Sequence, residues 1–270
     1  MSAFAIHLNF EFRSGIRNRS LLLLYYLFPL GFYLMASMLM TGLNPDFRAT
    51  LIPAMVLFTV LTSTFLGLPD PIVNARDAGI YRSYKIHGVP QLSILIIPVL
   101  TTILHTTIVS AIIVLTAPLL FDAVMPGNLL SFALGYLMAA FACASLGLLI
   151  GVIAPNSRAT ILLGQAFFLP SMMIGGLMFP AHLLPATLSK VSFLLPTTHA
   201  MNVINGWAPD GIVTLNPYVS AAALFAAGAL ALGIAIYLFS WDNQNRAPRN
   251  RALALIPLIP FVLALAVSYL

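Results

Sequence analysis

Few side chains in the long apolar segments of this sequence carry chemically useful groups. His105 is the one residue there that titrates near neutral pH, and nearby hydroxyls offer it hydrogen-bond partners: Thr101, Thr102, Thr106 and Thr107. An ionisable group in an apolar, membrane-crossing segment commonly marks the path of a substrate, an ion or a proton. We predict that His105 lies either on a substrate path or in a hydrogen-bonded contact between two helices.

Several kinds of chemistry are excluded by the motifs that the sequence lacks. It has no Gly-x-x-x-x-Gly-Lys-Ser/Thr run for ATP, no His-Glu-x-x-His run for zinc, and no cysteine pair, since Cys143 is alone. The apolar segments contain no acid, which disfavours both a membrane-embedded enzyme and a proton-driven secondary transporter. We expect no catalytic residue, metal site or cofactor in this chain, and we expect His182 and His199 to anchor the chain rather than bind metal.

The longest polar stretch on the inner side lies between two apolar segments, at roughly Pro69–Gln91. Proline at its start, and Gly88 and Pro90 at its end, are typical start and stop signals of a helix. We predict one short helix there that presents four charged residues to water: Arg76, Asp77, Arg82 and Lys85. The pattern alone leaves two interpretations equally open, a solvated loop and a docking element for a partner protein.

These residues must be positioned by seven long segments that contain no Asp, Glu, Lys or Arg. The segments are Leu21–Met40, Leu51–Leu68, Leu92–Phe121, Leu129–Ala154, Ala159–Phe179, Tyr218–Trp241 and Ala252–Leu270. Roughly 20 helical residues cross the hydrocarbon core of a bilayer, so each segment can span it or nearly span it. Only 7% of the residues are charged, and the mean hydropathy is +1.00. The sequence therefore predicts an all-α membrane protein that crosses the bilayer several times.

The basic residues indicate how the chain is oriented. With the N-terminus inside the cell, ten Lys and Arg residues lie inside and only Arg48 and Lys190 lie outside. The inside group is Arg13, Arg17, Arg19, Arg76, Arg82, Lys85, Arg158, Arg246, Arg249 and Arg251. Because this is the positive-inside pattern of short loops, we predict a multi-pass protein of the cytoplasmic (inner) membrane with its N-terminus inside. Topology also explains the net charge of +5, and we expect no nucleic-acid partner, since the basic residues form no dense patch.

Residues 1–20 precede the first apolar segment and have an amphipathic pattern. Drawn as a helix, they place Arg13 and Arg17 away from an apolar side that consists of Phe4, Ala5, Leu8, Phe12 and Ile16. This favours a helix that lies on the inner leaflet, with its arginines near anionic headgroups. The alternative is a frayed N-terminus.

Small residues recur at every fourth position of the segment Leu129–Ala154: Ala139, Cys143, Gly147 and Gly151. Such a ridge allows a second helix to approach closely. We predict a helix-packing surface, either within the chain, which we favour, or between two copies of it.

Prolines and glycines interrupt the second half of the chain. Pro170 and the pair Gly175-Gly176 predict a kink or break in the segment Ala159–Phe179, which Asn156 or Ser157 can cap. The following region, 180–217, is too apolar for a hydrated loop and too broken for a full span. We predict short re-entrant or interfacial helices there, on the outer side.

In this order, the segments resemble the permease subunits of type-2 ATP-binding-cassette (ABC) exporters, a family that includes drug, polysaccharide and lipid exporters. The resemblance covers about 4–241, and a basic amphipathic helix before the first span is its first feature. The other motifs are Asn74-Ala75-Arg76-Asp77-Ala78-Gly79-Ile80-Tyr81-Arg82 with Gly88-Val89-Pro90, Ala154-Pro155-Asn156-Ser157-Arg158, Phe179-Pro180 and Leu194-Leu195-Pro196-Thr197-Thr198-His199-Ala200.

The resemblance implies a six-helix permease core in residues 1–241, with an interfacial helix at 1–20 and re-entrant helices at 180–217. It implies two permease subunits, identical or different, and two separate cytoplasmic ATPase subunits that bind ATP and Mg²⁺. The N-terminal helix and a coupling helix at 72–87 would dock on the ATPase. The residues implied in this coupling are Arg13, Arg17, Arg76, Asp77, Gly79, Tyr81, Arg82 and Lys85. The chain itself would be non-catalytic and would export an amphipathic compound, a drug or a lipid; the alternative is a gradient-driven secondary transporter or channel.

Two features of the sequence depart from the family pattern. Ala75 occupies the first acidic position of the family's coupling run, so charge pairing with the ATPase would depend on the remaining charged residues. Residues 242–270 add a basic linker and an apolar segment with Pro257 and Pro260. We expect a seventh crossing there, because three arginines precede the segment; a helix along the interface and a hairpin are the alternatives.

Overall fold

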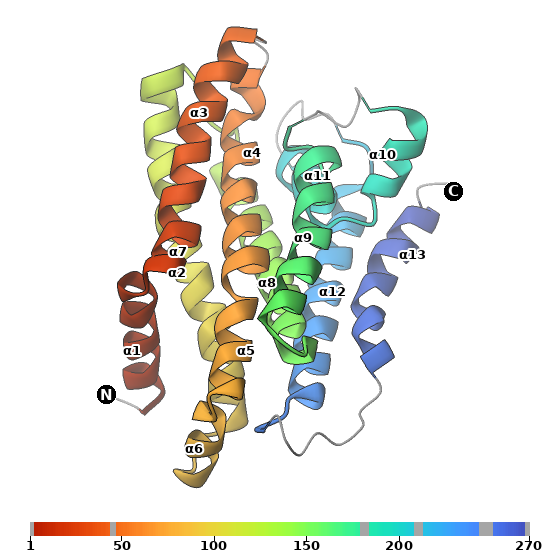
Figure 1. Ribbon diagram of the computed structural model, residues 1–270. Helices are drawn as coiled ribbons and strands as arrows, with labels where there is room; N and C mark the ends of the chain where they lie inside the picture. The colour runs from red at the N-terminus through yellow and green to blue at the C-terminus, as the bar shows by residue number, and fades with distance from the viewer. Residues whose placement is uncertain (1–2, 44–46, 179–183, 208–212, 243–250, 268–270) are drawn as a thin grey trace.

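The computed structural model describes residues 3–43, 47–178, 184–207, 213–242 and 251–267, and every regular element in these ranges is a helix (Figure 1). Within the described residues, five helices are long and apolar enough to cross a membrane: Arg19–Leu43, Phe47–Asp77, Gln91–Phe121, Leu129–Ile153 and Pro217–Leu238. The predicted class, an all-α polytopic membrane protein, is confirmed. Arg246, Arg249, His182 and Phe179-Pro180 lie outside the described residues, so the expectations about them stay predictions.

The first half of the chain forms an N-terminal helix and three long helices. Helix α1 (Ala3–Arg17) precedes a helix made of α2 (Arg19–Leu22), the π-helical turn η1 (Leu23–Leu27) and α3 (Phe28–Leu43). The second long helix comprises α4 (Phe47–Leu61), the π-helical turn η2 (Thr62–Gly67) and α5 (Pro69–Asp77). The short α6 (Ile80–Ile86) then leads into α7 (Gln91–Phe121).

The second half is built around two long helices, α8 (Leu129–Ile153) and α12 (Pro217–Leu238). In the sequence, α8 is followed by α9 (Ser157–Ile174) and the short helices α10 (Ala186–Ser192) and α11 (Pro196–Gly206), which precede α12. The chain then forms a 3-10 helix, η4 (Arg251–Leu258), and α13 (Ile259–Val267). The ends of α1 and α6 lie at one end of the bundle, and α10 and α11 lie at the other (Figure 1).

Asparagine side chains cap the start of four described helices, one of them α2, where Asn18 accepts from the backbone N–H groups of Ser20 and Leu21. Asn128 caps α8, Asn156 caps α9 and Asn216 caps α12, each by accepting a hydrogen bond from a backbone N–H of the first turn. Helix ends leave backbone donors without partners, and such donors are costly at membrane depth. Of the two caps predicted for α9, Asn156 is the one that the structure uses.

The centre of the bundle is the packing of α8 on the second long helix. A Cβ on Gly147 would overlap the carbonyl oxygen of Thr64, and a Cβ on Gly151 would lie 2.9 Å from the carbonyl oxygen of Pro69. Ala139 and Cys143, on the same ridge, are each 1% exposed. The small-residue ridge therefore faces α4, η2 and α5 of the same chain. On the opposite side, a Cβ on Gly164 of α9 would overlap the carbonyl oxygen of Phe65.

The region predicted to form one short helix at 72–87 is different in the structure. The second long helix continues without interruption to Asp77, so its last turns are α5 rather than a separate element. Gly79, with a φ of +74° that suits glycine, then turns the chain into α6. Helix α5 begins at Pro69, as the start signal predicted, but the expectation of a single helix is wrong because the chain breaks at Ala78-Gly79.

Two short helices, α10 and α11, occupy the region where re-entrant or interfacial helices were predicted. The residues of α11 from Pro196 to Ile204 are buried, against α8, α9 and α12. His199 is fully buried, and its Nε2 lies 2.7 Å from the carbonyl oxygen of Phe193 while its Nδ1 lies 3.2 Å from the hydroxyl of Ser220. These contacts anchor α11 to its neighbours. The depth of α10 and α11 in a membrane stays a prediction.

The C-terminal apolar segment packs along α12. Both η4 and α13 contact α12, and Phe261 is fully buried with its ring stacked on His199 at 5.1 Å. Residues 251–267 run back along the bundle (Figure 1), so the alternative of a hairpin within this segment does not hold. The apolar helix of 252–267 is shorter than the five long ones, and a seventh crossing stays a prediction.

Replacing Gly147 with valine should destabilise the bundle, because the new side chain would collide with the backbone of η2. We expect a loss of about 1–3 kcal/mol, as for overpacking of a filled core, measured as a lower melting temperature of the detergent-solubilised chain. Gly233→Val is the matched control, since nothing lies within 4 Å of an added Cβ at Gly233 in α12. Equal falls in melting temperature for both variants would contradict the packing described above.

Candidate functional site

Helix α6 projects from the end of the bundle with an exposed mixed surface (Figure 1). Ile86 is 77% exposed and Ile80 is 43% exposed, and Arg82 and Lys85 lie on the same short helix with exposed side chains. Exposed apolar residues flanked by positive charges are typical of a surface that binds a protein partner. We therefore consider α5 and α6, with the contacts that hold them, as the candidate site.

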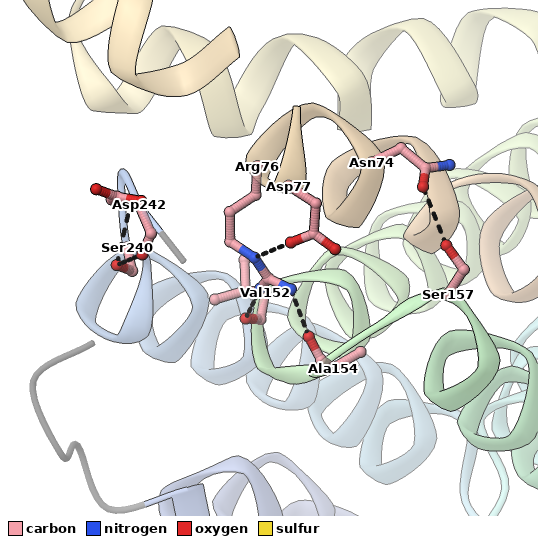
Figure 2. Close-up of polar contacts among 8 residues, drawn as sticks. All are labelled: Asn74, Arg76, Asp77, Val152, Ala154, Ser157, Ser240 and Asp242. Carbon is pink, nitrogen blue, oxygen red and sulfur yellow. Dashed lines mark hydrogen bonds and ion pairs between the residues drawn. The ribbon is translucent and has the colours of Figure 1, made fainter. Parts of the chain in front are cut away.

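Arg76 of α5 is the main connection between this site and the bundle. Its guanidinium donates hydrogen bonds to two backbone carbonyls at the end of α8, from Nη1 to Val152 at 3.1 Å and from Nη2 to Ala154 at 2.7 Å (Figure 2). Asp77 lies beside it, with Oδ1 3.4 Å from Nε. The last carbonyls of a helix have no intrahelical partner and carry partial negative charge, so a buried cation satisfies both needs.

The expectation that Arg76 faces water is wrong. The residue is 5% exposed, whereas Asp77 next to it keeps a side chain that is 37% exposed. The difference arises because α5 continues the membrane helix and turns Arg76 toward the turn after α8. Arg76 is thus a structural link within the chain, and its side chain is not available to a partner.

A second polar contact joins α5 to the following turn. The hydroxyl of Ser157, at the start of α9, donates to Oδ1 of Asn74 at 3.0 Å (Figure 2). Asn74 also donates from its amide to Asp70, one turn earlier, at 2.8 Å. The side chains of α5 therefore fasten it to both arms of the α8–α9 turn.

Helix α6 contacts a different part of the bundle, the residues at and just after the end of α12. The ring of Tyr81 is 5% exposed and packs 5.3 Å from the ring of Phe239. Arg82 forms an ion pair with Asp242, whose backbone carbonyl accepts a hydrogen bond from Ser240 (Figure 2 shows this turn). Tyr81 is thus a packing residue, while Arg82, with a side chain 54% exposed, still presents charge at the surface.

The other predicted coupling residues lie at the same end of the molecule. Arg13 and Arg17 are exposed on α1, and α1 reaches α6 through an edge-to-face contact of His7 with Tyr84 at 5.7 Å. Among the residues predicted for coupling, Arg13, Arg17, Arg82 and Lys85 are therefore exposed basic groups. Gly79 is the turn between α5 and α6, and Arg76 and Tyr81 are buried supports.

His105 is 1% exposed and lies where α1 crosses α7. Its Nδ1 is 2.7 Å from the hydroxyl of Tyr26, the ring of Phe12 stacks on it at 4.4 Å, and Gly15 leaves room for its Nε2. The residue is therefore a hydrogen-bonded contact between helices, and it also lines the cavity described next.

The neighbouring threonines are not the partners of His105, contrary to the expectation. Thr102 pairs with Tyr25 at 3.3 Å, and Thr106 and Thr107 both pair with Tyr136 of α8, at 3.0 and 2.8 Å. Thr101 bonds to carbonyls of its own helix. Residues adjacent in sequence point in different directions on a helix, so the side-chain partners of Thr102, Thr106 and Thr107 are tyrosines of other helices rather than His105.

A cavity of about 350 Å³ lies between α1, α5, α6 and α7, and the sequence did not predict it. Glu11 of α1 lines it, together with His7, Tyr84 and His105. Burial raises the pKa of the Glu11 carboxyl, and the nearby His7 lowers it in part. One signal was available in the sequence: Glu11 is the only glutamate, and it stands four residues after His7, on the same face of a helix.

In the described ranges, no three His, Cys, Asp or Glu side chains are grouped so that they could hold a metal ion. The geometry instead offers a rigidly held, exposed α6 beside an amphipathic α1, both at one end of an apolar bundle.

Comparison with known proteins decides the family. The family model described as "ABC-2 type transporter" matches residues 2–206. The chain belongs to this family. Nodulation protein J of Sinorhizobium fredii (strain NBRC 101917 / NGR234) is 31% identical over 99 residues, which make up 36% of this chain and 37% of that protein. The match thus spans little more than a third of this relative, and no solved structure matches the chain.

The family match confirms the resemblance found in the sequence, and it identifies the chain as a membrane transport protein. The matched residues include α1 and every helix up to α11, so α5 and α6 lie inside the ABC-2 region, while Phe239 and Asp242, which hold α6, lie after it. Helices α12 and α13 follow the matched region.

Replacing Arg76 with methionine should loosen α5 from the end of α8, because the two carbonyls would stay buried without donors. We expect a loss of about 1–3 kcal/mol in the free energy of unfolding, measured as a lower melting temperature, and faster hydrogen exchange in residues 69–86. Arg158→Met, which removes an exposed arginine close to the same turn, is the control. Unchanged exchange in the Arg76 variant would refute the role given to this side chain.

Proposed function

We propose that this ABC-2 transporter is the membrane-spanning permease subunit of an ATP-driven exporter, and that α6 and α1 dock on a separate ATPase subunit. One observation supports the proposal. Within an ABC-2 chain, α6 presents exposed basic and apolar side chains at the end of the bundle, while the ion pair of Arg82 with Asp242 attaches α6 to the rest of the chain. Because the sequence has no nucleotide-binding run, the ATPase subunit would supply ATP and Mg²⁺.

The proposed coupling uses the connections of α5. Movement of the ATPase would push α6, and α5 is continuous with α4, the most buried of the long helices. Through Arg76 the same push reaches the end of α8, since Val152 and Ala154 accept its hydrogen bonds. Two central helices would therefore move together when α6 moves, which suits an ATPase that closes and opens as a pair.

The rest of the proposal concerns assembly and cargo. The complex would contain two permeases and two ATPase subunits in the cytoplasmic membrane, with α1 and α6 on the inner side. The apolar helices, whose buried polar groups are mostly Ser, Thr, Tyr and His, suit an amphipathic compound, a drug or a lipid better than a small ion. Export is the expected direction, and the permease itself would be non-catalytic.

The direct test is purification of the detergent-solubilised chain from its native operon, with mass analysis of what accompanies it. We expect an ATP-binding subunit in equal amount. A chain that purifies alone, and that moves solute in proteoliposomes along a proton or sodium gradient without ATP, would overturn the proposal in favour of a secondary transporter.

Reversing the two exposed charges of α6, by Arg82→Glu together with Lys85→Glu, should uncouple the ATPase. Charge reversal at an interface introduces repulsion, so we expect ATP-dependent transport to fall by at least about tenfold, with membrane insertion unchanged. The measurement is transport and ATPase stimulation in proteoliposomes that contain the partner. Lys190→Glu, a reversal on α10 at the opposite end, is the control and should leave transport unchanged.

The ion pair of Arg82 with Asp242 requires a second comparison. Arg82→Glu combined with Asp242→Arg reverses the charge on α6 but keeps an opposite pair inside the chain. We expect this variant to remain poorly coupled, because the ATPase would still meet a negative charge on α6. Full recovery of transport would show that Arg82 acts only within the chain.

A further inference from the structure

The cavity between α1, α5, α6 and α7 has the features of a binding site for a positive charge. Glu11 is the one carboxylate among its lining residues, and no Lys or Arg lines it. In the part of the chain that the structure describes, Glu11 forms no ion pair with a basic side chain. Burying a carboxylate is costly, and His7, which also lines the cavity, offsets this cost only in part. A bound cation would offset the remainder.

Aromatic rings line the same cavity as this carboxylate. Tyr81 and Tyr84 from α6 and Tyr25 from η1 line the cavity with Glu11, and Phe10 stands beside it on α1. The Glu11 charge is close enough to act on the first two: burial raises the pKa of Tyr84 and of Tyr81, and Glu11 raises both further. Aromatic faces attract organic cations, most strongly where water is excluded.

The remaining walls are largely apolar, and they determine the kind of cation. Leu68, Ile72 and Ile94 are buried residues of the lining, and Pro98 lies among them on α7. A metal ion requires several oxygen ligands, which one carboxylate with apolar walls does not supply. The volume of about 350 Å³ falls in the range of pockets that hold drug-sized molecules.

We propose that this cavity binds an amphipathic organic cation, with Glu11 as its counter-ion and the tyrosine rings as its apolar contacts. The proposal rests on the proposed exporter function in one respect, since it makes the bound cation a member of the transported class. The cavity lies within a single chain, so binding needs neither the ATPase nor a second permease.

Two probes of the same size and shape but opposite charge test this assignment. Tetraphenylphosphonium is an aromatic cation, and tetraphenylborate is its anionic counterpart. Binding of each is measured by isothermal calorimetry to the purified full chain in dodecyl maltoside. We expect saturable binding of tetraphenylphosphonium, and at least about tenfold weaker binding after Glu11→Gln, as expected for loss of a charged partner. Tetraphenylborate should bind weakly, with no loss after Glu11→Gln.

Two further variants separate the site from general effects. Asp122→Asn removes one negative charge at a position outside the cavity lining and should not alter binding. Ser14→Trp places a large ring at an exposed position of the lining and should reduce tetraphenylphosphonium binding without changing the charge. It also provides a test of the site if the Glu11 variant fails to fold.

Equal affinity of the cation for wild type and Glu11→Gln, or equal affinity of the two probes for wild type, would overturn the inference. Because binding is measured on the chain alone, its failure is distinct from failure of the exporter proposal. If the purified chain binds no cation but the ATPase subunit co-purifies from the native operon, only the cavity assignment is refuted. If the chain binds the cation but no ATPase subunit co-purifies, only the docking role is refuted.

Discussion

The buried guanidinium of Arg76 is the contact on which the candidate site depends. It donates hydrogen bonds to the carbonyls of Val152, in the last turn of α8, and of Ala154, its C-cap, where a helix leaves backbone acceptors without intrahelical partners. The same two hydrogen bonds hold α5 against the end of α8, and α6 follows α5 directly in the chain. An arginine is suited to this task because its planar fork reaches two acceptors at once and keeps its charge at any physiological pH.

Close backbone contacts extend this connection into the bundle. Gly147 of α8 and Gly164 of α9 touch the carbonyl oxygens of Thr64 and Phe65, both within the π-helical turn η2. A π turn places its carbonyls differently from those of an α-helix, and only glycine allows the neighbouring helices to come this near. At these two glycines, the backbones of α8 and α9 therefore lie directly against the backbone of η2, with no side chain between them. Such a contact transmits a displacement rather than absorbing it.

The positions of the long helices could be predicted from the sequence, but the groups that their polar side chains contact could not. Apolar length predicted the ends of α8 to within a residue, and the cap predicted at Asn156 is present at the start of α9, because desolvation and backbone pairing are local constraints. Arg76 looked like a solvated charge because its acceptors are backbone carbonyls 76 and 78 residues away, and a carbonyl has no sequence signature. The threonines near His105 show the same limit, since helix rotation decides which of them meets Tyr136. Glu11 was overlooked because a lone acid in an amphipathic helix resembles an exposed one until the helix is packed.

Helix α6 belongs to both proposed sites, and this has a consequence for coupling. One face of α6 carries Lys85 at the surface, while Tyr84, the preceding residue, forms part of the cavity wall near Glu11. A displacement of α6 by an ATPase subunit would therefore change the shape of the cavity without any intermediate element. By reciprocity, a cation that prefers one position of α6 would shift the docking equilibrium by the same free energy. In the proposed exporter, occupancy and docking would thus be linked through a single seven-residue helix, whose base is fixed by Tyr81, Arg82 and the turn at Gly79.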